Sequence, residues 1–206
     1  LVTNSRSDFK ILEKLGESGA CNIDTACKVG ELGADFVRAK DAVAHMVFNL
    51  YRSNGTAIGA YICTGTLLND TDPSTQVPYF WTARHCFAGG SGDVPAQDMA
   101  RVAASLTTYW NYEAASCNSG TSSSRATLGG GADVLFDDEH TDAMLLRLRN
   151  PAPAGATFAG WDAAGLPTGA DVVAIHHPSG DAKKVSFGRH VPADDEPSMR
   201  AVGWLS

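Results

Sequence analysis

A histidine and an aspartate, each beside an apolar segment, are the residues of this sequence best suited to chemistry. His85 lies in Thr82–Cys86, directly after the apolar run Tyr79–Trp81, and Asp142 precedes the apolar run Ala143–Leu148. An imidazole, with an ordinary pKa of about 6.5, can accept a proton near neutral pH. A carboxylate bonded to its other nitrogen fixes its tautomer and stabilises the imidazolium that forms. The two residues are therefore candidates for a general base and its orienting carboxylate.

The adjacent histidines His176 and His177 suggest an alternative, a metal-dependent hydrolase that uses them together with His85. Neighbouring residues of a strand point to opposite faces, so these two side chains would not readily converge on one ion. The sequence also has no H-E-x-x-H and no paired C-x2–4-C knuckles, the patterns typical of zinc sites. We interpret the histidine pair as structural. Ser179, in Pro-Ser-Gly-Asp, has the residues of a nucleophile turn in scrambled order, and we do not predict that it acts as one.

Length, charge and hydropathy exclude several classes of protein. The 206 residues suffice for one large domain or two small ones. The net charge of −7, from 16 basic and 23 acidic residues, argues against a nucleic-acid partner, which usually requires a basic surface. No apolar run approaches the roughly 18 residues of a membrane helix. Residues 1–8 lack the pattern of a signal peptide, so we expect any export signal to have been removed already.

The elements that must position the candidate residues are short strands separated by turns. Asn54-Gly55 is a strong hairpin signal between the apolar segments Ala42–Tyr51 and Ala57–Cys63. Helices are scarce: 30–38 is predicted to form a turn or two, and 85–88 one turn. Many short strands with Gly, Pro and Ser between them indicate a β-sandwich or barrel. The further predicted strands are 78–82, 100–110, 126–128, 144–148, 172–175 and 184–187.

Five cysteines in an acidic chain rich in Gly, Ser and Thr favour disulfides and an oxidising compartment over free buried thiols. They are Cys21, Cys27, Cys63, Cys86 and Cys117. Because five is odd, one thiol either stays free or pairs with a cysteine outside this chain.

These motifs together resemble the trypsin-like serine endopeptidases. Thr82–Cys86 and Asp142–Leu148 are similar to the histidine and aspartate motifs of that family, and Cys63–Asn69 is similar to its C-x-G-x-L strand. More narrowly, the chain resembles the bacterial lysyl endopeptidase branch from about Cys21 to its end. The segments that carry this narrower resemblance are 21–24 with Cys27, 109–112 before Cys117, 159–162, and 174–181 followed by 183–186.

The resemblance implies a fold, a mechanism and a pattern of disulfides. The fold would be all-β, with two six-stranded antiparallel barrels, of which this chain holds the first and the start of the second. His85 would be the general base and Asp142 its partner, with no metal or organic cofactor. The implied disulfides are Cys63–Cys86 and Cys27–Cys117. The implied substrate is a peptide or protein cleaved after Lys, or after Arg, by a secreted or periplasmic bacterial enzyme.

One member of the implied triad is missing. The family's serine lies in a G-[DS]-S-G turn, which this sequence does not contain. We therefore expect the serine to lie outside this chain, with a second polypeptide linked through Cys21 as our preferred arrangement, and we expect this chain to be inactive alone. A pseudoprotease or binding module that kept the fold is the alternative.

The expected organisation has three parts. Residues 1–20 would be an N-terminal extension or a pro-segment remnant. Residues 21–150 would form the first barrel, which contains His85 and Asp142, and residues 151–206 would begin the second barrel and stop before the nucleophile. Asn150–Pro153, where two prolines interrupt the strand pattern, marks the soft boundary between the barrels.

Overall fold

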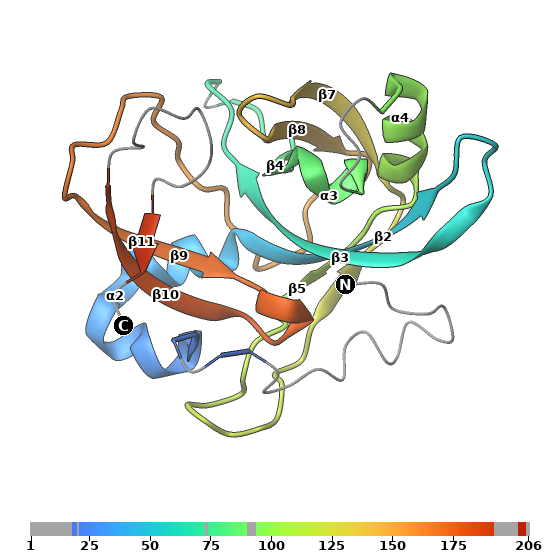
Figure 1. Ribbon diagram of the computed structural model, residues 1–206. Coiled ribbons are helices and arrows are strands. Elements are labelled where there is room, and N and C mark those ends of the chain that lie inside the picture. The colour runs from blue at the N-terminus through green and yellow to red at the C-terminus, as the bar shows by residue number, and fades with distance from the viewer. Residues whose placement is uncertain (1–17, 20, 73, 90–93, 192–201, 205–206) are drawn as a thin grey trace.

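A computed structural model describes residues 18–19, 21–72, 74–89, 94–191 and 202–204 of the chain (Figure 1). The described residues form two antiparallel sheets, which confirms the predicted all-β class. The expected N-terminal extension, residues 1–20, lies almost wholly outside the described residues.

The first sheet contains seven strands and carries the main core. Its order is β6-β5-β2-β3-β4-β8-β7, and within the described residues the sheet is not closed into a barrel by pairing of β6 with β7. Its longest strands, β2 and β3, form the hairpin that Asn54-Gly55 predicts, with Gly55 at φ 83°. The strand bounds are β2 Val43–Tyr51, β3 Ala57–Leu68, β4 Tyr79–Ala83, β5 Thr107–Trp110, β6 Ala126–Leu128, β7 Ala132–Asp138 and β8 Ala143–Leu148.

The second sheet is smaller and lies beside the first, drawn mainly in orange and red in Figure 1. In it β10 (Lys184–His190) pairs with β9 (Asp171–His176), with β1 (Ile23–Asp24) and with β11 (Val202–Trp204). The helix α2 (Thr25–Asp41) lies next to this sheet, and its backbone leaves the helical conformation at Gly33. The helix is thus longer than the short stretch expected over 30–38, and the break lies within that stretch.

One predicted strand is wrong in its first half. Residues 100–110 were expected to be extended, but Ala96–Ala104 form the helix α4, and only Thr107–Trp110 form β5. Three apolar side chains of this helix are buried: Met99, and Val102 and Ala103, three and four positions further along the chain. This spacing places them on one face of a helix, which covers the core of the first sheet.

The strand β4 separates the core from the outer surface of the first sheet. Phe80 is fully buried and Thr82 nearly so, whereas Trp81 is 42% exposed. This alternation is the period of two that an antiparallel strand with one buried face requires. The helix α3 (Arg84–Ala88) follows directly, which confirms the single helical turn expected there. None of the described helices is long and apolar enough to cross a membrane.

The contact between Gly65 and Phe80 gives a stability prediction. A Cβ added to Gly65 would lie 2.2 Å from Cε1 of Phe80, a ring that is buried in the core and has little room to move. We expect Gly65→Ala to lower the free energy of unfolding by about 2–3 kcal/mol. The matched control is Gly30→Ala in α2, where the added Cβ meets nothing within 4 Å. It should be neutral or stabilise by up to about 1 kcal/mol. Urea unfolding of both variants measures the difference, and equal effects would contradict it.

Candidate active site

The candidate general base lies where a strand of the first sheet ends. His85 is the second residue of α3, directly after β4, and Asp142 directly precedes β8. Because β4 pairs with β8 in the register Ala83↔Ala143, the residues just beyond this pair are brought together. The sheet register thus places two residues 57 positions apart side by side.

The carboxylate of Asp142 makes two contacts with His85. Its Oδ2 lies 2.6 Å from Nδ1 of the ring, and its Oδ1 accepts a hydrogen bond of 2.7 Å from the backbone N–H of His85. Both the ring and the backbone of the histidine are therefore held by one side chain. The His85 side chain is 61% exposed, whereas that of Asp142 is only 13% exposed. The imidazole can thus meet a molecule from solvent while its orienting group stays protected.

The backbone around this pair is specialised. Asp142 has φ 54°, in the left-handed region that aspartate tolerates better than most residues. In this conformation its carbonyl accepts a hydrogen bond of 2.9 Å from the N–H of Arg84, at the start of α3. The Arg84 side chain is buried and forms an ion pair of 2.9 Å with Asp137 of β7. The hairpin that carries Asp142 is therefore fastened to the helix that carries His85.

Two disulfides are present, with the pairing that the family resemblance implied. Cys63–Cys86 ties β3 to α3 directly beside His85, and Cys27–Cys117 ties α2 to the loop after β5. Cys21 is exposed and is free within the described part of the chain.

The two disulfides should differ in what they contribute to stability. Cys27 and Cys117 are 90 positions apart, and Cys63 and Cys86 are 23 positions apart. In the chain-entropy model, closing the longer loop removes more conformational entropy from the unfolded state and therefore stabilises the fold more. We expect replacing Cys27 and Cys117 by serine to cost about 4–5 kcal/mol, against about 3 kcal/mol for Cys63 and Cys86. Guanidinium unfolding of the two double variants tests this order. A larger loss from the shorter loop would show that native packing outweighs chain entropy.

The histidines of the rejected metal site lie elsewhere. His176 Nε2 contacts Asn22 Oδ1 at 3.0 Å, and His177 Nδ1 contacts the carbonyl of Asp181 at 3.0 Å. Among the residues that the structure describes, Cys63, His85 and Cys86 are the group of three metal-ligating side chains whose ligand atoms lie within 4.8 Å of one another. Neither His176 nor His177 belongs to this group.

Sequence reasoning missed a buried pair of histidines where the two sheets meet. His45 of β2 and His177 after β9 lie with ring centroids 5.1 Å apart, beside Tyr112. Within the described residues, neither ring nitrogen of His45 has a hydrogen-bond partner, and Nε2 of His177 has none. Burial lowers the pKa of His45 to about 3, with a smaller effect from the charge of Arg125. Burial also lowers the pKa of His177 well below its ordinary value. Both imidazoles are therefore neutral near pH 7.

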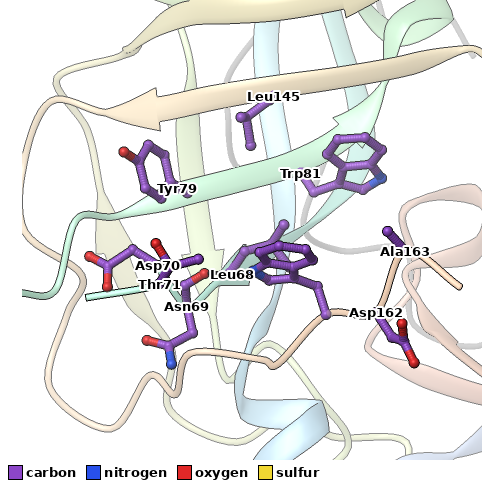
Figure 2. A pocket seen from close by; sticks show the side chains of 10 residues that line it. Leu68, Asn69, Asp70, Thr71, Tyr79, Trp81, Leu145, Asp162 and Ala163 are labelled. Atoms are coloured by element: carbon purple, nitrogen blue, oxygen red, sulfur yellow. Dashed lines mark hydrogen bonds between the residues drawn. The ribbon is translucent and has the colours of Figure 1, made fainter. Parts of the chain in front are cut away.

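A pocket of about 720 Å³ lies on the outer face of β4 and β8 (Figure 2). Trp81, Tyr79 and Leu145 line it, together with Trp161 from the segment after the first sheet. Trp161 is 58% exposed, and its Nε1 donates a hydrogen bond to the carbonyl of Asn69 at 3.1 Å. Neither His85 nor Asp142 is among the residues that line this pocket.

Comparison with known proteins shows the family of this chain. Residues 15–205 match the family described as lysyl endopeptidase, C-terminal domain. The chain belongs to this family. A lysyl endopeptidase of Pseudomonas aeruginosa is 37% identical over 199 residues, which cover 93% of this chain. The chain spans only 40% of that relative's length. The resemblance to the lysyl endopeptidase branch is thereby confirmed for nearly the whole sequence.

Proposed function

We propose that this chain contributes the base and its orienting carboxylate to a serine endopeptidase that cleaves peptide bonds after Lys or Arg. The observation that carries the proposal is the double contact between Asp142 and His85, at 2.6 and 2.7 Å. With Nδ1 protonated toward Asp142, the Nε2 lone pair of His85 is available to accept a proton. Membership of the lysyl endopeptidase family supports the reaction class and the preference for lysine.

In the proposed reaction, a serine Oγ attacks the scissile carbonyl while His85 Nε2 takes the hydroxyl proton. The imidazolium, stabilised by Asp142, then donates this proton to the leaving amine, and an acyl-enzyme remains. Water hydrolyses the acyl-enzyme with His85 again as the base. No metal or organic cofactor takes part in these steps.

The serine of this mechanism is proposed to come from polypeptide outside the 206 residues, which contain no G-[DS]-S-G motif. Either the same chain continues or a second polypeptide supplies it, joined to the exposed thiol of Cys21 by a disulfide. The two disulfides favour a secreted or periplasmic enzyme, because such bonds persist in oxidising compartments.

Labelling the complete protein with a fluorophosphonate tests the proposal. We expect one labelled serine, and we expect His85→Ala to abolish labelling because the serine is then not activated. Electrophoresis with and without reductant separates the two arrangements, since only a disulfide-linked second polypeptide would leave this chain on reduction. Absence of label from a folded complete protein would favour a pseudoprotease or binding module. If a serine is labelled, mass spectrometry of peptides that the unlabelled protein has digested identifies the residue before each cleaved bond.

A further inference from the structure

The side chains around His85 offer a second chemistry once the neighbouring disulfide is opened. The ligand atoms of Cys63, His85 and Cys86 lie within 4.8 Å of one another. We propose that reduction of Cys63–Cys86 creates a binding site for a borderline-soft divalent cation such as Zn²⁺. Its ligands would be the two thiolates and Nε2 of His85.

The distances suit a tetrahedral ion. Cys86 Sγ lies 3.9 Å from His85 Nε2. With a Zn–S bond of about 2.3 Å and a Zn–N bond of about 2.0 Å, tetrahedral angles place sulfur and nitrogen about 3.5 Å apart. A shift of a few tenths of an ångström would therefore bring this pair to ligand distance. The two sulfurs must separate to about 3.8 Å, and rotation of two side chains whose Cα atoms are 6.2 Å apart can provide this.

The orientation of His85 also suits a metal ligand. Zinc-binding histidines commonly donate their second ring N–H to a carboxylate, which fixes the tautomer and aims the other nitrogen at the ion. Asp142 Oδ2, 2.6 Å from Nδ1 of His85, is placed to accept that bond. The imidazole is 61% exposed, so a water molecule can reach the fourth position. Two cysteines, one histidine and one water form an established coordination set for zinc.

The oxidation state of the two sulfurs decides whether the site exists. In the disulfide neither sulfur is a thiolate, and only the thiolate binds the metal. A phosphine reductant breaks the S–S bond by taking the oxygen of one water molecule as phosphine oxide. Phosphorus thereby loses the two electrons that the sulfurs gain, and the two hydrogens of the water end on the thiols. Zn²⁺ then displaces these two protons.

The consequence for catalysis rests on the proposed function. A metal ion on Nε2 occupies the lone pair that would accept the serine proton. Reduction would therefore remove a structural bond and, in the presence of zinc, also block the base. Metal binding itself is measured on this chain without any proteolytic assay, so failure of one idea is distinguishable from failure of the other.

Titration of the reduced chain with Co²⁺ under anaerobic conditions tests the site. We expect one Co²⁺ to bind with a thiolate-to-metal charge-transfer band, which Zn²⁺ displaces, and no such band in the oxidised chain. Replacing Cys63 and Cys86 by serine should abolish the band, whereas the same change at Cys27 and Cys117 should leave it. Asp142→Asn should weaken binding about 10- to 100-fold.

Protection from alkylation gives a second test that uses the wild-type chain, whose reduced form is first shown by circular dichroism to be folded. In the reduced wild-type chain, Zn²⁺ should slow iodoacetamide labelling of Cys63 and Cys86, but not of Cys21, Cys27 or Cys117. Equal labelling of all five thiols with zinc present would overturn the proposal. So would a full charge-transfer band in the chain that lacks Cys63 and Cys86, or unchanged affinity in His85→Ala.

Discussion

Replacing His85 by alanine in the complete protease should lower kcat/KM by about 10⁴- to 10⁶-fold, because the serine would lose its proton acceptor. The fold should survive, since the His85 side chain is 61% exposed and contributes little to the core. Asp142→Asn should cost about 10⁴-fold, because an amide cannot stabilise the imidazolium and favours the wrong tautomer. Steady-state cleavage of a peptide with a single lysine measures both effects.

Two results separate a catalytic from a structural role for this pair. The double variant should be scarcely slower than His85→Ala alone, because the two residues act as one unit. A control variant, His190→Ala on β10, removes a partly exposed histidine from the other sheet and should leave the rate near wild type. If His85→Ala retained more than about a tenth of the activity, another base would have to be sought.

The candidate site was predictable because its signals are local. Thr82–Cys86 combines the end of an apolar strand with the start of a short helix, and the structure has β4 and α3 at these positions. Asp142 stands before an apolar strand in the same way. Sequence alone could not show that β4 and β8 are neighbours, so the pairing of these two residues rested on their chemistry and on the family resemblance.

Other features required tertiary context. The strand β7 (Ala132–Asp138) was not predicted, because three of its seven residues are acidic and interrupt the apolar pattern of a strand. In the fold, Asp133 pairs with Arg147 and Arg149, and Asp137 pairs with Arg84. The carboxylates of Asp133 and Asp137 thus lie on an edge strand, where they remain partly solvated. The helix α4 was missed for a different reason, since its short apolar repeat suits either a strand or a helix.

The buried histidine pair was missed because its two members come from different sheets. His45 lies inside an apolar strand, and nothing in its own segment indicates which residues cover it. His177 follows the last residue of β9 in the second sheet. Its backbone N–H donates a hydrogen bond of 2.9 Å to Thr64 Oγ1 of β3 in the first sheet. Only the packing of one sheet against the other brings the two imidazoles together. Their lowered pKa values make this contact sensitive to acid.

Acidification should therefore destabilise the fold through His45 and His177. In the unfolded chain each imidazole binds a proton below about pH 6.5, whereas folded His45 stays neutral until about pH 3. Stability is thus fully present above the unfolded pKa and is lost as the pH falls from there toward the folded value. At about pH 4.5 the loss from His45 alone is about 3 kcal/mol, a large share of a typical stability of about 5–15 kcal/mol. His177 adds to it with the same sign, since burial and the nearby charge of Lys183 also lower its pKa.

Urea unfolding at a series of pH values, followed by circular dichroism, measures this loss. His45→Phe removes one titrating group while keeping an aromatic ring among Tyr109, Tyr112 and His177, so its stability should fall less between about pH 7 and pH 4.5 than that of the wild type. His140→Gln, at an exposed position, should leave the slope unchanged. If the larger ring disturbs packing, His45→Leu gives the same comparison. Titration of the His45 ring protons by NMR is the decisive test. If the imidazole of the folded protein gained its proton near about pH 6.5, its ordinary value, the contact between His45 and His177 would contribute nothing to acid unfolding.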